Sequence, residues 1–428
     1  MPDSSPPGSL LGQFHPQSLL GIAAIVALAW ALSENRRLFP WRIVVGGLFL
    51  QAAIALLLLK VPFARHGLFA LNSAVTALTD ATRAGTSFVF GFVGGGAPPF
   101  SVTNPANMAS FAFGVLPLVI VISALSALLW HWRILPIVIN GIAFVLRKLM
   151  RLGGAVGLCS GATIFFGMVE APLLIKPYLP KITRSELFIL LTVGLASVAG
   201  TVFVLYATIL KAVLPGALGH ILVASMMSLP AAIVVARIMI PGDATTDTAE
   251  GTATLYRSSM DAVAHGTEDG LRIYLNIVAM LIVMLALVSL ANAILHLAPM
   301  VGGQPVTLER IFGWLFSPIV WLYGVPWSEA STAGSLMGVK TILNELIAYL
   351  KLAALPQGAL DPRSTLIMVY AMCGFANIGS VGIMLAGMSA LVPTRRDEIV
   401  PLAMRAIVSG TMASGLTGSM IGFLPIAG

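Results

Sequence analysis

Charged residues are scarce in this chain, and cysteine is nearly absent. Only 10% of the 428 residues are Asp, Glu, Lys or Arg, whereas 58% are hydrophobic, and mean hydropathy is +0.95. A soluble core of this length does not need such an excess of apolar residues. Cys159 and Cys373 both fall in apolar stretches without ligand-like spacing, so neither a disulfide nor a zinc site is expected. The composition is typical of a polytopic membrane protein.

Signatures of membrane enzymes and of ATP-driven proteins are also missing. The sequence has no HExxH, no DDxxD arrangement, no GxGD motif and no GxxxxGK followed by Ser or Thr. The chain therefore does not use ATP directly, which leaves an ion gradient as the energy source. We expect no cofactor, and Na⁺ or H⁺ as the coupling ion.

The net charge of +7 does not indicate a nucleic-acid partner. The Lys and Arg residues lie in short segments between apolar runs, as the positive-inside rule predicts for cytoplasmic loops. The first sixteen residues are rich in Pro and Ser and have no basic start, which argues against a cleaved signal peptide. The pattern places both termini outside, in the periplasm of a bacterial inner membrane.

Apolar runs near the ~20 residues that a bilayer requires predict an all-α protein with eight transmembrane helices. These spans cover residues 17–33, 42–61, 109–132, 186–213, 216–240, 271–297, 365–391 and 399–425. Two more stretches, 64–90 and 308–323, read as helices lying in the membrane interface.

Two apolar stretches are too short and too interrupted to cross a bilayer as simple helices. Residues 152–179 have basic segments at both ends, RKLMR and KITRSE, so this stretch enters and leaves on the cytoplasmic face as a re-entrant hairpin. Residues 327–352 form a second hairpin from the outer face. Each hairpin precedes two spans, and the two sets, 152–240 and 327–425, form an inverted repeat of the kind found in secondary transporters.

This pattern predicts an order of units along the chain. A disordered N-terminus (1–16) precedes N-terminal spans and interfacial helices that include part of a scaffold (17–150). The first hairpin with its two spans (151–240), a cytoplasmic linker (241–270), a scaffold span with an interfacial helix (271–326), and the second hairpin with the last two spans (327–428) follow.

Two glutamates lie midway through the hairpins, Glu170 in FFGMVEAPLLI and Glu345 in KTILNELIAY. Each would cost roughly 2.5–3.5 kcal/mol on insertion scales unless it faced a water-filled or substrate-filled cavity. Asn377 and Ser380 lie in a span weakened by glycines, where an unwound stretch can bind hydroxyls of a neutral polar solute. The position of Lys340, five residues before Glu345, is equally compatible with a structural ion pair and with substrate contact. These residues predict a binding site at the centre of the protein.

Four stretches carry a resemblance to a known family: GMVEAPLLIKPYLPKITRSELF, DAVAHGTEDGLRIYLNIVAML, GVPWSEASTAGSLMGVKTILNELIAY and CGFANIGSVGIMLAGMSALVPTRRDEI. They resemble concentrative nucleoside transporters, including bacterial NupC-like members, in order from about residue 64 to the C-terminus. The resemblance implies a homotrimer whose protomers hold a scaffold domain and a transport domain. It also implies nucleoside import by alternating access, coupled to Na⁺ or H⁺.

The resemblance also assigns roles to residues. Glu345, Asn377 and Ser380 match the residues that bind ribose, Glu170 matches the glutamate on the nucleobase side, and Phe375 matches an aromatic beside the substrate. A carboxylate that accepts two sugar hydroxyls makes directional, charge-assisted hydrogen bonds.

The chain departs from the family at two places. Where members commonly read GQTE, this chain reads Gly167, Met168, Val169 and Glu170, so the amide that contacts the base is replaced by an apolar side chain. At the sodium site, the usual Asn aligns with Thr163, while Ser197 supplies a hydroxyl and Phe166 and Val198 supply backbone carbonyls. Protonation of Glu170 or Glu345, favoured by burial, is an alternative route of coupling.

Three alternatives stay open from the sequence. In the first, the substrate is another ribosyl or polyol solute, because Met168 and Val169 replace the polar residues that contact the base in the family. In the second, the chain is a membrane enzyme with Glu170 and Glu345 as acid and base. In the third, it is a transporter-like receptor that binds without moving its solute.

Overall fold

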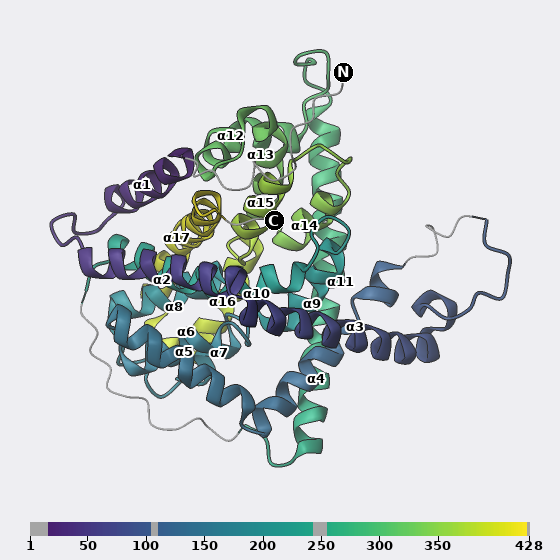
Figure 1. Cartoon of the computed structure of the whole chain (residues 1–428), viewed down its shortest axis with the longest axis horizontal. Coiled ribbons are helices and arrows are strands. Elements are labelled where there is room, and N and C mark those ends of the chain that lie inside the picture. The colour runs from purple at the N-terminus through teal and green to yellow at the C-terminus, as the bar shows by residue number, and fades with distance from the viewer. Residues whose placement is uncertain (1–15, 104–109, 243–254, 426–428) are drawn as a thin grey trace.

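The computed structural model describes residues 16–103, 110–242 and 255–425, and within these ranges the chain is helical. The predicted disordered N-terminus lies outside the described residues except for residue 16. The α-helices are α1 Pro16–Ala31, α2 Trp41–Lys60, α3 Pro62–Phe90, α4 Leu118–His131, α5 Ile134–Met150, α6 Gly154–Ala162, α7 Glu170–Leu173, α8 Arg184–Ala196, α9 Gly200–Leu210, α10 Ala217–Met239, α11 Ser259–Leu295, α12 Leu308–Tyr323, α13 Trp327–Ile342, α14 Glu345–Ala353, α15 Pro362–Met372, α16 Ile378–Leu391 and α17 Arg396–Phe423. In Figure 1, α3 projects from the body of the molecule, and the long helix α11 runs along one side of the core.

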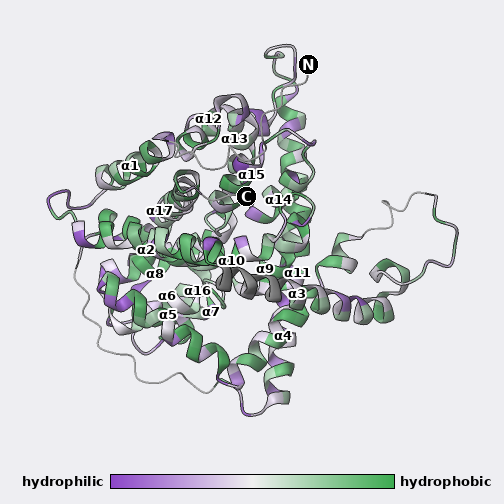
Figure 2. Cartoon of the chain, in the orientation of Figure 1, coloured by the Kyte–Doolittle hydropathy of each residue, from purple (hydrophilic) through white to green (hydrophobic). Residues whose placement is uncertain are grey.

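The apolar helices agree with an all-α polytopic membrane protein. Six helical segments of the described chain are long and apolar enough to cross a membrane, and α1 and α16 are shorter apolar helices. Figure 2 shows hydrophobic residues along most helices and hydrophilic ones in the loop between α1 and α2. With the pair α15–α16 counted as one span, these segments correspond to the eight predicted spans.

The predicted span at 186–213 is long and apolar enough to cross a membrane, but it is broken into two helices. α8 ends at Ala196 and α9 begins at Gly200, and the residues between them are extended rather than helical. The span at 365–391 is broken as expected, between α15 and α16. The element order hairpin, broken helix and continuous helix therefore occurs twice, as α6 to α10 and as α13 to α17.

The predicted linker 241–270 is also too long, because α11 already begins at Ser259. The Ser258 hydroxyl caps this helix by accepting a hydrogen bond from the Asp261 N–H, with an O–N distance of 3.1 Å. Gly266 and Gly270 then let α11 pack closely on α4, since a Cβ on either would lie 2.7 Å from a Cα of that helix. Small residues of this kind allow membrane helices to approach closely. The part of the linker at 243–254 lies outside the described residues.

The two hairpins differ in their second arms. In the second hairpin, α13 and α14 are both helical and meet at residues 343–344. In the first, α7 has only four residues, and turns continue to residue 181. Pro172, Pro177 and Pro180 lie in this arm, and each removes a backbone donor that a helix needs. The proline spacing therefore keeps the second arm irregular.

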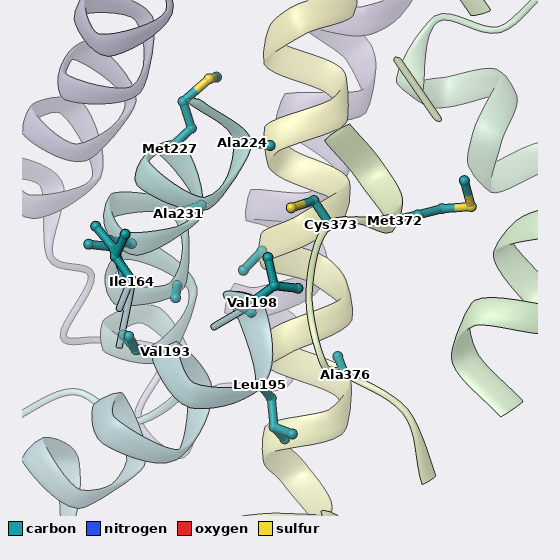
Figure 3. Packing of buried hydrophobic residues seen from close by; sticks show 14 of the residues in the cluster. Ile164, Val193, Leu195, Val198, Ala224, Met227, Ala231, Met372, Cys373 and Ala376 are labelled. Atoms are coloured by element: carbon teal, nitrogen blue, oxygen red, sulfur yellow. The ribbon is translucent and has the colours of Figure 1, made fainter. Parts of the chain in front are cut away.

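The two helix breaks lie against each other in the core. The Phe375 N–H donates to the Ser197 carbonyl, with an N–O distance of 3.2 Å. A Cβ on Gly374 would lie 2.6 Å from the Ala196 carbonyl oxygen and 2.7 Å from the Ser414 hydroxyl oxygen. Figure 3 shows the irregular segments that carry Val198 and Cys373 as neighbours. The two halves of the repeat thus meet where their helices are unwound.

A charge network links the loop after α1 to α8 and α17. Glu34 accepts a hydrogen bond from Arg184 with an N–O distance of 2.9 Å, and it also pairs with Arg405. The Arg184 guanidinium lowers the pKa of the Glu34 carboxyl. Arg184 is thus held in a structural ion pair, and the Glu186 side chain closes a capping box with Thr183.

Candidate substrate site

The Glu345 carboxylate is the centre of a buried hydrogen-bonded cluster. One carboxylate oxygen accepts from the Tyr206 hydroxyl at 2.7 Å, and the other accepts from the Asn377 side-chain amide at 3.2 Å. The Glu345 side chain is 4% exposed and Asn377 is 2% exposed. The cluster joins α9, α14 and the start of α16, so it connects the two halves of the repeat.

Local capping places the cluster at two helix N-termini. The Asn344 side-chain oxygen accepts from the Ile347 N–H at 2.9 Å, which starts α14 at Glu345. The Asn377 side-chain oxygen accepts from the Ser380 N–H at 2.8 Å, which starts α16. Asparagine is a preferred N-cap residue, and the positive end of a helix stabilises a nearby carboxylate. Asn377 thus caps a helix with its oxygen and donates to Glu345 with its nitrogen.

Lys340 lies in the last turn of α13 and is fully buried. Its ammonium has no hydrogen-bond partner within the part of the chain that the structure describes. The direct ion pair that the sequence allowed is therefore not formed in this conformation. The C-terminal end of α13, where Lys340 lies, carries a partial negative charge that favours this ammonium.

A cavity of about 190 Å³ lies beside the first hairpin. Among the predicted substrate residues, it is lined by Gly167, Met168, Val169, Glu170 and Phe375. α4, α9, α11 and α16 complete its wall, with Ser123, Thr201, Asp269 and Ile383 among the residues they contribute. Two carboxylates and no Lys, Arg or His belong to the described lining. Such a wall disfavours phosphorylated solutes and suits neutral or cationic ones.

At the tip of the first hairpin, glycines make room for the side chains of Met168, Val169 and Glu170. A Cβ on Gly167 would lie 2.2 Å from a carboxylate oxygen of Glu170, so glycine leaves room for that side chain. Met168 packs beneath Gly194 of α8, and Val169 packs against Gly387 of α16. Both side chains also line the cavity, which makes this part of the wall apolar.

The structure brings the predicted substrate residues together in two neighbouring groups, not one. Glu345, Asn377 and Ser380 do not line the cavity, whereas Phe375 and Ile383 do. Asn377 and Ser380 lie between those two residues in the chain, so the cluster and the cavity share the start of α16. In this conformation, protein donors occupy both oxygens of Glu345.

The four predicted ion ligands lie near the two helix breaks. The Thr163 hydroxyl donates to the Ser160 carbonyl at 2.7 Å, and the Ser197 hydroxyl donates to the Val193 carbonyl at 2.9 Å. The Val198 carbonyl accepts from the Ser225 hydroxyl at 3.3 Å. Gly200 packs on the backbone of residues 164–165, which places the break after α8 next to the segment that carries Phe166.

Sequence reasoning assigned no role to Tyr206 or Asp269. Tyr206 lies in the apolar run GTVFVLYATIL, where a single tyrosine gives no signal of its contact with Glu345. Asp269 lies inside the predicted linker 241–270, and α11 carries it to the cavity wall. Only the tertiary contacts of α9 and α11 reveal these two residues.

Three family models match the chain in sequence order. "Na+ dependent nucleoside transporter N-terminus" covers residues 20–93, "Nucleoside recognition" covers 112–213, and "Na+ dependent nucleoside transporter C-terminus" covers 220–422. Together they span most of the chain.

Relatives and solved structures agree with these matches. The uncharacterized transporter YutK of Bacillus subtilis is 38% identical, over 94% of this chain and 98% of that protein. The nucleoside permease NupC of Helicobacter pylori is 33% identical, over 95% and 96%. The structure of CNTnw in an inward-facing substrate-bound state has a TM-score of 0.86 and 33% identity, over 95% of this chain and 98% of that one. Because these relatives are transporters, the alternative of a membrane enzyme is set aside. The chain belongs to the concentrative nucleoside transporter family.

Proposed function

We propose that this protein is a symporter that imports nucleosides across a bacterial inner membrane by alternating access, coupled to an ion gradient. The observation that carries the proposal is the Glu345 cluster, where a buried carboxylate and amide are held at two helix N-termini. Solved structures of CNTnw include inward-facing and intermediate states with TM-scores of 0.86 and 0.87, which supports a fold that changes access. The assembly is a homotrimer, and each protomer divides into a scaffold and a transport domain.

In this proposal, the ribose and the base occupy the two neighbouring groups. The ribose hydroxyls replace Tyr206 or Asn377 as donors to Glu345, while the base enters the cavity beside Phe375. The cavity volume of about 190 Å³ is below the roughly 300–1,000 Å³ of ordinary small-molecule pockets. A nucleoside therefore needs both the cavity and the space beside the Glu345 cluster. Because the start of α16 lies between them, it must shift when the substrate binds.

We propose Na⁺ as the coupling ion. The hydroxyl protons of Thr163 and Ser197 are already donated to carbonyls, so the lone pairs of both oxygens remain free to accept a cation. The carbonyls of Phe166 and Val198 complete a set of oxygen donors, which hard cations prefer. Protonation of Glu170 or Glu345 is the competing route.

The test is uptake of radiolabelled uridine and adenosine into proteoliposomes. Accumulation under an imposed Na⁺ gradient, with none under a proton gradient, is the expected result. Accumulation under the proton gradient alone would retain nucleoside transport and overturn Na⁺ coupling. Absence of accumulation with both gradients would move the substrate to another ribosyl or polyol solute.

Restoring the polar base contacts is expected to change selectivity. Met168→Gln with Val169→Thr adds an amide and a hydroxyl to the cavity wall, and each new hydrogen bond is worth about 1 kcal/mol. Competition by a panel of unlabelled nucleosides should shift by roughly tenfold between bases that differ in donors and acceptors. Met168→Leu, which keeps the wall apolar, is the matched control. An unchanged ranking in the double variant would show that these side chains do not face the base.

A further inference from the structure

A basic cavity lies at the ends of three helices, outside the substrate site. Its volume is about 640 Å³, and it is lined by Phe39, Pro40, Trp41, Arg42, Ile43, Arg151, Arg237 and Gly242. It is formed where α2 begins and where α5 and α10 end. Three of the described lining residues are arginines, and no described lining residue is acidic. The cavity therefore has the charge to hold an anion.

The acidic residue in the described loop before α2 pairs with arginines outside the cavity. Glu34, the one acidic residue of the loop before α2, is paired with Arg184 and Arg405. Within the described ranges, the guanidinium groups of Arg42 and Arg151 make no ion pair. Arg237 is 2% exposed and donates to the Ser185 hydroxyl and the Gly242 carbonyl, which fixes its charge in the wall.

An apolar cavity lies deeper along the same three helices. Its volume is about 190 Å³, and its lining includes Leu50 and Ile54 of α2, Gly141 and Val145 of α5, and Pro230 of α10. At a rise of 1.5 Å per residue, Leu50 is roughly 12 Å along α2 from Arg42, and Pro230 is roughly 10 Å along α10 from Arg237. The basic and apolar cavities therefore follow one another from the ends of the helices inward.

The surface of α5 connects the two cavities. Val145 lines the apolar cavity and is 41% exposed, and Leu149 is 48% exposed one turn further toward Arg151. Residues four apart lie on the same face of a helix. Trp41, at the mouth of the basic cavity, is 68% exposed, and tryptophan is enriched at the level of lipid headgroups. An acyl chain along α5 would place its headgroup among the arginines.

We propose that α2, α5 and α10 form a specific site for an anionic phospholipid. The phosphate of the headgroup binds between Arg42, Arg151 and Arg237, and one acyl chain follows Leu149 and Val145 into the apolar cavity. Basic pockets between helices on the cytoplasmic side of a membrane hold anionic headgroups in this way. The site is independent of the substrate site, so its test does not depend on the transported solute.

The first test is native mass spectrometry of the purified full chain with added phosphatidylglycerol or phosphatidylcholine. The wild-type protein should retain phosphatidylglycerol in preference. Arg42→Gln with Arg151→Gln should weaken phosphatidylglycerol binding on the order of tenfold to thirtyfold. Each basic side chain near an anionic lipid contributes a factor of about five to the affinity. Arg37→Gln with Lys148→Gln removes the same charge outside the cavity and should retain the lipid. Equal loss in both double variants, or equal binding of the two lipids, would overturn the proposal.

The acyl chain is tested by filling the apolar cavity without a change of charge. A Cβ on Gly141 would meet no atom within 4 Å, so Gly141→Leu should fold and block the chain, with a several-fold loss of retained phosphatidylglycerol. Gly85 also has open space around it, and Gly85→Leu is the matched control, which should retain the lipid. Inorganic phosphate added in excess should not displace the lipid. Full displacement by phosphate, or retention in Gly141→Leu, would show an anion site without a lipid chain.

Discussion

Replacing Glu345 by glutamine should reduce nucleoside uptake at least about 100-fold. The carboxylate offers two acceptors, which the Tyr206 hydroxyl and the Asn377 amide use in this conformation. Glutamine keeps one acceptor and presents an N–H₂ group to one of these donors, so it cannot accept two ribose hydroxyls. Each charge-assisted hydrogen bond contributes about 1.5–3 kcal/mol, and the loss of two corresponds to two or more orders of magnitude in binding.

The variant should nevertheless fold, because glutamine has nearly the same shape and leaves no charge buried. Uptake, substrate affinity by calorimetry and the melting temperature of the purified protein separate binding from stability. Glu309→Gln is the matched control, since Glu309 pairs with Lys351 at 2.7 Å and lies outside the cluster. This control should transport at close to the wild-type rate. Normal uptake by Glu345→Gln would remove Glu345 from the proposed ribose site.

Replacing Gly374 by alanine should disrupt the crossing of the two helix breaks. The new Cβ would lie 2.6 Å from the Ala196 carbonyl oxygen, and backbone atoms in a packed core cannot move away cheaply. Overpacking of this kind typically costs 1–3 kcal/mol. The break must then open, which moves Asn377 away from Glu345. We expect uptake to fall at least about tenfold, with a lower melting temperature.

Gly382→Ala is the control for this prediction. Gly382 lies in α16, and a Cβ there would meet no atom within 4 Å. Alanine has a higher helix propensity than glycine by about 1 kcal/mol, so this variant should be at least as stable as the wild type and transport normally. If Gly374→Ala matched Gly382→Ala in uptake and melting temperature, the close crossing would not be required.

Much of the architecture is predictable because the bilayer constrains sequence strongly. Every backbone polar group must be satisfied within the membrane, so runs of apolar residues near the required length mark helices directly. Charged residues inside such runs are costly, which is why Glu170 and Glu345 stand out. The sequence does not show the break after α8, because residues 197–199 are small or apolar and the apolar run continues across them. The early start of α11 is not evident from the sequence, because its first turns are polar and resemble a linker.

The sequence by itself determined the class of protein, the two hairpins and the pair of glutamates, because hydropathy and the cost of a buried charge are local properties. Only the tertiary structure decided what those glutamates contact. It joined Tyr206 to Glu345 across 139 positions of the chain, placed Asp269 in the same cavity wall as Glu170, and separated the Glu345 cluster from that cavity. Such contacts arise where helices distant in sequence cross, and their geometry depends on the packing of both partners.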